Sequence, residues 1–152
     1  MLRCVSSVEE ALNVVEGSNG YEQQSLDMIP MKFRTKQVCE KAVKTYYQNF
    51  IHVPNELKLV SSIYTIALKQ NPLFLAIIDQ KDIMEEMVNL VMSYTDLDLI
   101  IIRYVPEQFR TYEICLKAVL YDEDLSIYII DPDIFEKVLN KVNKNKNKPT
   151  NL

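Results

Sequence analysis

Apolar residues recur at helical spacing in short segments along the chain. Ile114, Ala118 and Tyr121 lie three or four residues apart, which is the spacing of one helix face. Thr111 precedes them as a helix N-cap, and Thr35 precedes a second segment of the same kind. The pattern therefore predicts short α-helices that begin after these two threonines. The apolar positions of the second segment are Val38, Ala42 and Val43.

Other apolar segments follow these helices and are rich in β-branched residues. Such short, continuously apolar segments fit either a strand or a buried helix, because periodicity alone does not separate the two. We expect helices, since capping residues flank the segments and an apolar residue followed by proline ends them. These segments are residues 72–78, 97–104 and 124–130. Residues 8–16 predict a further helix that ends at Gly17, and residues 17–24 predict a loop.

The chain repeats itself. Residues 29–43 and 105–119 share a Pro-x-x-Phe-Arg-Thr-x-x-x-Cys-x-Lys-Ala-Val pattern, with eight of fifteen positions identical. A third copy at residues 53–68 keeps the Val-Pro start, and Asp131 opens a fourth. The spacing of the prolines indicates a period of about 25 residues, enough for two short helices and their turns. A unit of this size buries its apolar face only by stacking on its neighbours.

The sequence thus predicts an all-α protein with one domain at residues 1–143. We expect about five short helix pairs of ~25 residues, packed as a compact or slightly curved array. The units open near residues 29, 53, 80, 105 and 131. Residues 144–152 alternate Lys and Asn without an apolar core position, so this tail is expected to be disordered.

Residues 105–119 and 67–71 resemble a family of α-helical repeats of uncharacterised function. Its pattern runs V-P-E-x-L-R-T-x-E-[IL]-C-L-x-A-V, and the resemblance covers about residues 26–140. The chain departs from the family where a glycine usually follows the Asn or Asp, since Pro72 stands after Asn71. Such repeats occur in intracellular and amoeba-associated bacteria, in their translocated effectors and in large DNA viruses. The resemblance implies a helical repeat domain, a role at a host interface and no catalytic residue.

The rare residue types remove several classes of function. With only two glycines, the chain lacks the glycine-rich loops that hold dinucleotides and nucleoside triphosphates. A single histidine excludes multi-histidine metal sites. Neither a membrane-spanning apolar segment nor a secretory leader is apparent, so we expect the cytoplasm, or a host cytosol after translocation. No cofactor or metal is predicted.

The three cysteines are widely spaced and suit reduced thiols better than disulfides or zinc ligands. Cys39 and Cys115 occupy apolar positions of helical patterns, where a free cysteine packs as a small hydrophobe. His52 stands before Val-Pro at the end of an apolar run, where a helix-terminal packing role is expected. We therefore predict no enzyme; the alternative is a cysteine-dependent enzyme that uses Cys39 or Cys115 with His52 as its base.

Pairs of carboxylates occur where helices or units are expected to begin. An Asp-x-Asp pair can hold a divalent cation, but at these places the carboxylates also suit helix capping, which we favour. In the pair Asp131 and Asp133, the intervening Pro132 suits the first position of a helix, which strengthens the capping interpretation. The pairs are Asp96 with Asp98, Asp122 with Asp124, and Asp131 with Asp133.

Charge divides the chain unevenly. Residues 32–58 hold six Lys or Arg and two Glu, a balance of +4, whereas residues 79–136 have a balance of −10. An acidic surface attracts a basic protein and repels nucleic acid. The basic segment, with Arg34, Lys36, Lys41 and Lys44, suggests weak nucleic-acid binding as a further alternative.

These features together predict a protein-binding module, such as a small effector, regulator or inhibitor, whose acidic C-terminal surface binds a basic site on its partner. Tyr47 and Tyr112 flank the apolar pattern and are expected to be exposed at the partner surface. Membrane binding is not expected, nucleic acid is disfavoured, and the separated charges permit self-association. The predicted partner-binding residues are Tyr47, Asp96, Asp98, Glu107, Tyr112, Asp122, Glu123 and Asp124.

Overall fold

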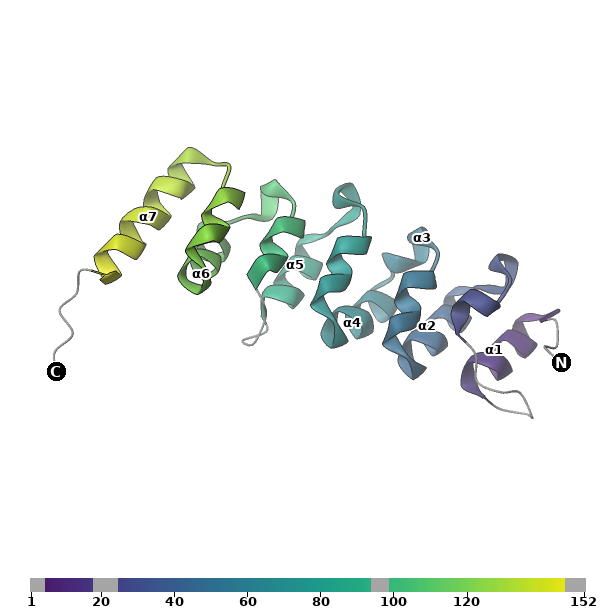
Figure 1. Cartoon of the computed structure of the whole chain (residues 1–152). Helices are drawn as coiled ribbons and strands as arrows, with labels where there is room; N and C mark the ends of the chain where they lie inside the picture. Colours follow the sequence, from purple (N-terminus) through teal and green to yellow (C-terminus); the bar gives the residue numbers. More distant parts are fainter. Residues whose placement is uncertain (1–4, 18–24, 94–98, 147–152) are drawn as a thin grey trace, which may run out of the picture. The chain divides into compact units, whose positions relative to one another are not determined.

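The computed structural model describes residues 5–17, 25–93 and 99–146. Within these ranges the protein is all-α: α-helices alternate with 3-10 helices, and none of the described residues forms a strand (Figure 1). The all-α class predicted from the sequence is therefore confirmed. The chain divides into two compact units, residues 1–82 and 83–152.

The described residues of the first unit form three α-helices of nine or ten residues and a single turn of α-helix. They are α1 (Val8–Glu16), α2 (Lys36–Thr45), α3 (Asn55–Lys58) and α4 (Ser61–Gln70). Helix α2 lies between α1 and α4 and packs against both (Figure 1). The 3-10 helices of this unit are η1 (Leu26–Met28), η2 (Met31–Phe33), η3 (Tyr47–His52), η4 (Pro72–Ile77) and η5 (Gln80–Asp82).

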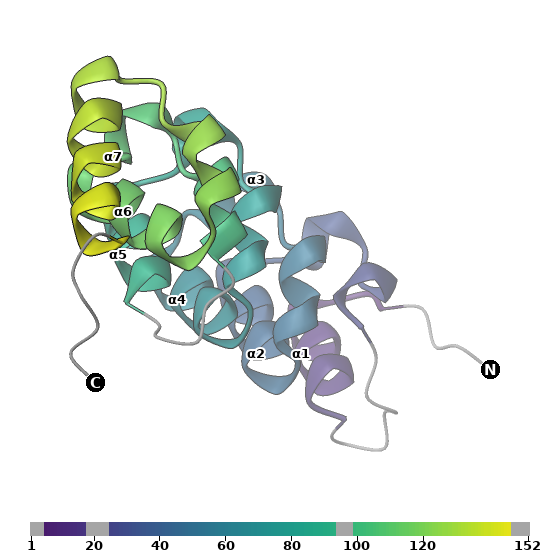
Figure 2. The same cartoon turned by 60° about the vertical axis from the view of Figure 1, so that its left-hand side comes forward.

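The described residues of the second unit form three α-helices and three 3-10 helices. The α-helices are α5 (Glu85–Met92), α6 (Tyr112–Tyr121) and α7 (Pro132–Lys146). The 3-10 helices are η6 (Leu99–Tyr104), η7 (Glu107–Phe109) and η8 (Glu123–Tyr128). Helix α6 is central, since it packs against α7, η6 and η8 (Figure 2).

The helix starts predicted from the sequence are confirmed. The hydroxyl oxygen of Thr35 accepts from the backbone N–H of Val38, and that of Thr111 accepts from Ile114. Ser7 caps α1 in the same way through the N–H of Glu10. Each bond satisfies one of the backbone donors that the first turn of a helix leaves unpaired.

Gly17 ends α1 as predicted. Its φ of 66° lies in the left-handed region, which a residue without a Cβ adopts at little cost. The loop predicted for residues 17–24 otherwise lies outside the described residues.

The second apolar segments are helical, as predicted, but they wind as 3-10 helices. Each spans about six residues and is closed by i to i+3 hydrogen bonds, as in Ile78 N–H to Leu75 O and Ile129 N–H to Ser126 O. Asn71 and Asp122 each precede such a segment, and their side-chain oxygens accept from the backbone N–H two residues later. These tight Asx turns start a short, tightly wound segment.

Each unit buries its own apolar core. In the first unit Phe50 is fully buried, and its ring centroid lies 5.6 Å from that of Phe74. In the second unit the core residues Cys115, Ala118 and Val119 of α6 pack with Val138 and with others. The remaining buried members of that core are Leu99, Ile102, Leu125, Ile129 and Val142.

Helix α7 reaches Lys146, so it includes the first three residues of the predicted disordered tail. The ammonium group of Lys146 lies 2.6 Å from a carboxylate oxygen of Glu123. This ion pair and the lysines in the last turn stabilise the end of the helix, because cations interact favourably with its C-terminal dipole. The predicted tail thus begins inside α7 as the structure has it, and residues 147–152 lie outside the described residues.

Candidate binding surfaces

An arginine fixes the start of α2 in the first unit. The Arg34 guanidinium donates to the carbonyl oxygen of Ile29 at 2.8 Å, to that of His52 at 2.9 Å and to that of Asp27 at 3.0 Å. These carbonyls belong to three different turns, so one side chain joins η1, the approach to η2 and the end of η3. A charged donor of this kind makes stronger hydrogen bonds than a neutral one.

The second unit contains the same arrangement 76 residues later. The Arg110 guanidinium donates to the carbonyl oxygen of Val105 at 2.8 Å and to that of Tyr128 at 2.7 Å. The two thiols also make equivalent hydrogen bonds. Cys39 donates to the backbone carbonyl of Arg34, and Cys115 donates to the backbone carbonyl of Arg110, both at 3.5 Å. Arginine, threonine and cysteine of the repeated motif therefore have local structural roles in both units.

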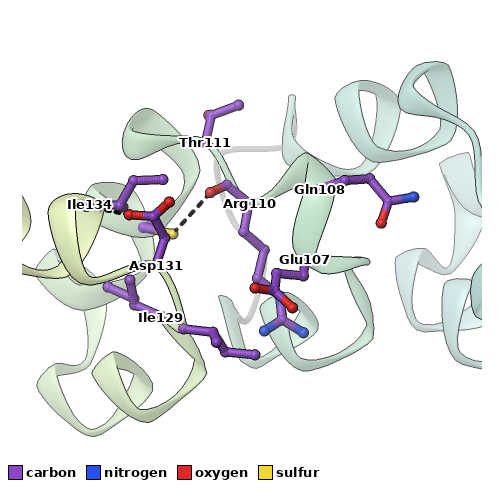
Figure 3. Close-up of a pocket in the computed structure, with 9 residues that line it drawn as sticks. Glu107, Gln108, Arg110, Thr111, Ile129, Asp131 and Ile134 are labelled. Carbon is purple, nitrogen blue, oxygen red and sulfur yellow. Dashed lines mark hydrogen bonds between the residues drawn. The ribbon is translucent and has the colours of Figure 1, made fainter.

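A hollow of about 590 Å³ lies beside Arg110 in the second unit (Figure 3). Glu107 and Asp131 bring carboxylates to its wall, and Ile129 and Ile134 bring apolar surface. The figure shows these side chains around the open space, with the Cys115 thiol bonded to the Arg110 carbonyl. The wall thus combines two carboxylates, the guanidinium of Arg110 and apolar surface, and its net charge is negative.

Two of the three predicted carboxylate pairs act as helix caps. Asp131 accepts from the backbone N–H of Asp133 at 2.9 Å and from that of Ile134 at 3.0 Å, at the start of α7. Asp122 accepts from the N–H of Asp124 at 3.0 Å. The capping interpretation is confirmed for these two pairs, whereas Asp96 and Asp98 lie outside the described residues.

The turn from α6 to η8 exposes acidic and apolar side chains together. The carboxylates of Asp122, Glu123 and Asp124 are exposed. Next to them in the chain, Leu120 is 53% and Tyr121 61% exposed. We call residues 120–127 the acidic turn; Ile127, 74% exposed, ends it.

Within the second unit, the described residues that were predicted to bind a partner lie at both ends of α6. Glu107 and Tyr112 lie at the N-terminal end of α6, whereas Asp122 follows its C-terminal end. The ten residues of α6 separate these ends by about 15 Å, at a rise of about 1.5 Å per residue. Tyr47 belongs to the first unit, on η3. Among the described residues of the second unit, the acidic turn therefore brings together the largest group of them.

The expectation that Tyr47 and Tyr112 are exposed is wrong. Tyr47 is half-buried because its ring packs beside Phe74, with the ring centroids 6.0 Å apart. Tyr112 is half-buried because it packs against the core of the second unit. Tyr46 and Tyr121 are more exposed, at 56% and 61%. Tyr121 is the last residue of α6, and Tyr46 directly follows the last residue of α2. At a helix end, the helical periodicity of the sequence does not predict whether a side chain is exposed to solvent.

The two described cysteines are free and buried, as predicted. Burial raises the pKa of Cys39 to about 11, against a smaller opposing effect of Arg34, and burial also raises the pKa of Cys115. Both thiols therefore stay protonated at neutral pH, which disfavours a nucleophilic thiolate. His52 ends η3 and its carbonyl accepts from Arg34, in keeping with the predicted helix-terminal role.

Much of the basic segment has local partners. Arg34 donates to three carbonyls, the Lys36 ammonium lies 3.7 Å from Glu40, and the Lys41 ammonium lies 2.8 Å from Glu16. These contacts reduce the charge that the segment offers to a phosphate backbone. Lys44 remains exposed.

Two buried polar residues were not predicted from the sequence. The Asn49 side chain accepts from the backbone N–H of Leu26 at 2.8 Å and donates to the carbonyl of Ala42 at 3.0 Å. Lys58 takes the place of Arg34 in the third copy of the motif, four residues after a proline, and burial lowers its pKa. Its ammonium donates to the side-chain oxygen of Asn55 at 3.2 Å. A basic residue four positions after a proline recurs in the repeated motif, and this pattern was a sequence signal for Lys58. No such repeated pattern exists for Asn49.

No family model matches the chain, and neither a curated protein nor a solved structure shows significant similarity to it. Among the described residues, no helix is long and apolar enough to cross a membrane. The same residues contain no group of three or more His, Cys, Asp or Glu placed to hold a metal ion. The candidate surfaces must therefore be interpreted from their own chemistry.

Proposed function

We propose that the chain is a protein-binding module without catalytic activity, and that the acidic turn contacts a basic and apolar surface of its partner. The observation that carries this proposal is the mixed character of residues 120–127. Three carboxylates there are exposed beside Leu120, Tyr121 and Ile127, whose exposed fractions are 53%, 61% and 74%. Exposed apolar side chains next to charge are typical of interfaces, where a half-polar tyrosine contributes contact area at low entropic cost.

The proposed architecture for this function is an array of helical repeats. The match between residues 29–53 and 105–129, in helix bounds and in arginine contacts, supports it. Such arrays present the turns between helices as an extended surface, and residues on those turns vary without disturbing the core. A small effector, regulator or inhibitor could use such a surface, in line with the family resemblance.

The hollow beside Arg110 supports a basic partner as well. Its carboxylates, Glu107 and Asp131, could receive a lysine or arginine side chain whose methylene groups pack on Ile129 or Ile134. Buried thiols with raised pKa values give no comparable support to the alternative of a cysteine-dependent enzyme.

Affinity capture from lysates of a candidate host tests the proposal. The tagged chain is compared with a variant that carries Glu123→Lys and Asp124→Lys, while Asp122 is left in place because it caps η8. We expect a stoichiometric partner that the variant loses and that purified components bind with the same dependence. Capture that is indifferent to these two charges would contradict the role of the acidic turn.

A matched pair of apolar substitutions separates binding from stability. Ile127 of η8 and Ile51 of η3 occupy the same place in the two units and are 74% and 49% exposed. We expect Ile127→Ser to weaken binding to the captured partner and Ile51→Ser to leave it unchanged. Equal loss from both variants would mean that the partner contacts the 3-10 helices in general.

A further inference from the structure

A second surface of the second unit has the opposite charge. A groove of about 340 Å³ runs between the start of α6 and the C-terminal half of α7. Its wall consists of Tyr112, Asn140 and three lysines, Lys137, Lys141 and Lys144. Among the described residues no carboxylate lines it. We call it the lysine groove.

The three lysines lie on one face of α7 and have no counter-charge there. Their spacing of four and three residues places them side by side along about 10 Å of helix. Within the described part of the chain, none of the three ammonium groups makes an ion pair or a side-chain hydrogen bond, whereas Lys146 pairs with Glu123. Like charges at this spacing repel one another, so an anion in the groove would relieve that repulsion.

We infer that the lysine groove binds a short acidic peptide segment of a partner protein. The carboxylates of such a segment would meet Lys137, Lys141 and Lys144, and an apolar side chain would pack against Tyr112. The Asn140 amide adds both a donor and an acceptor for the peptide backbone. This surface is distinct from the acidic turn and needs no assumption about the proposed function.

The surrounding charge favours a short anion over a nucleic-acid strand. Exposed Glu136 precedes Lys137 in the chain, and exposed Glu113 follows Tyr112. A polyanion that continues beyond the groove would meet these carboxylates, while a segment with about three charges would not. The groove therefore selects its ligand by length as well as by sign.

Fluorescence anisotropy tests this inference with two labelled probes. The first is a ten-residue peptide in which three glutamates flank one central leucine and the other residues are glycine and serine, and the second is a ten-nucleotide oligothymidine. We expect saturable binding of the peptide that weakens as salt is raised, because screening acts on exposed charges. Replacement of all three groove lysines by Gln should weaken it about tenfold. Tyr112→Phe should retain the affinity, since the ring remains.

A control variant carries the same change of charge elsewhere. Lys44, Lys69 and Lys81 are exposed lysines of the first unit, and their replacement by Gln should leave peptide affinity within about twofold. Circular dichroism checks that both variants fold. The inference is overturned if the peptide does not bind by about 1 mM, if the two lysine variants lose affinity equally, or if oligothymidine binds more tightly through the same three lysines.

Discussion

Residues 29–53 and 105–129 adopt the same local structure with different surfaces. In both, a threonine caps the α-helix, an arginine reaches a carbonyl eighteen residues later, and a cysteine donates to the arginine's carbonyl. The turn after the α-helix differs: its residues are Tyr46, Tyr47 and Gln48 in the first unit, and Asp122, Glu123 and Asp124 in the second. The two segments thus share a few inward-facing residues that hold the backbone, and differ in the side chains of the turn.

The two segments also differ in one buried position. Asn49 on η3 bonds to the N–H of Leu26 and to the carbonyl of Ala42, and so attaches η1 to the rest of the first unit. Leu125 holds the matching place on η8 and packs in an apolar core. The same helical geometry therefore accommodates a polar connection in one unit and apolar packing in the other.

The largest difference between the segments should come from their arginines. Arg34→Ala removes hydrogen bonds to three carbonyls and should lower the free energy of unfolding by about 3 kcal/mol, whereas Arg110→Ala removes two and should cost about 2 kcal/mol. Urea unfolding followed by circular dichroism measures both. Lysine at either position should recover only part of the loss, since it offers no planar set of donors. A larger loss from Arg110→Ala would contradict this ranking.

Replacing Asn49 by Leu, and Leu125 by Asn, should show how strongly each core depends on the residue that it buries at this position. Asn49→Leu leaves the N–H of Leu26 without its partner and removes one of the two donors to the carbonyl of Ala42, which keeps the N–H of Tyr46, and Leu125→Asn places an amide in an apolar core. We expect each change to cost about 2–3 kcal/mol in urea unfolding, because a buried polar group without a partner is expensive. As a control, Leu125→Met should cost less than half as much. If Asn49→Leu proves neutral, the polar connection to η1 has no stabilising role.

Local signals in the sequence predicted much of this fold. The caps at Thr35 and Thr111 were predictable because a side chain and the N–H three residues later meet within one turn. The buried cysteines were predictable from helical periodicity. Winding as a 3-10 helix was not, because six apolar residues contain too little of either period to separate the two helix types.

The contacts that periodicity missed join residues far apart in the chain. The carbonyl of His52 lies eighteen residues after Arg34, and the backbone N–H of Leu26 lies 23 residues before Asn49. The orientation of Tyr47 toward Phe74 likewise depends on how η3 meets η4. Sequence patterns predict where such elements lie; their packing decides which side chains face solvent.

The buried thiols should make stability depend on alkaline pH. Burial raises the pKa of Cys39 from its ordinary 9.0 to about 11. Over this window the unfolded chain loses the thiol proton while the folded chain keeps it, so stability falls as the pH rises. We expect Cys39 to contribute a loss of about 2 kcal/mol between pH 9 and 11. The readout is the difference between the parent chain and Cys39→Ala, which cancels the titration of other groups.

Cys115 allows a comparison with Cys39 in the same experiment. Its pKa is also raised by burial, although Asp131 contributes to the rise and Arg110 opposes it. Cys115→Ala should therefore reduce the alkaline loss of stability in the same direction as Cys39→Ala. Fast alkylation of either thiol in the native protein at neutral pH would contradict the protection that burial provides.

The smallest effects should come from the two caps, and they should be equal. The hydroxyl oxygens of Thr35 and Thr111 lie 3.4 Å from the N–H groups that they accept from. Thr35→Ala and Thr111→Ala should each cost about 1 kcal/mol in urea unfolding, and serine should restore most of it because it keeps the hydroxyl. Unequal losses would mean that the first turns of the two helices, which contain Lys36 in α2 and Glu113 in α6, change the strength of the cap through their charge. Equal losses would show that the cap acts independently of the turn's charge.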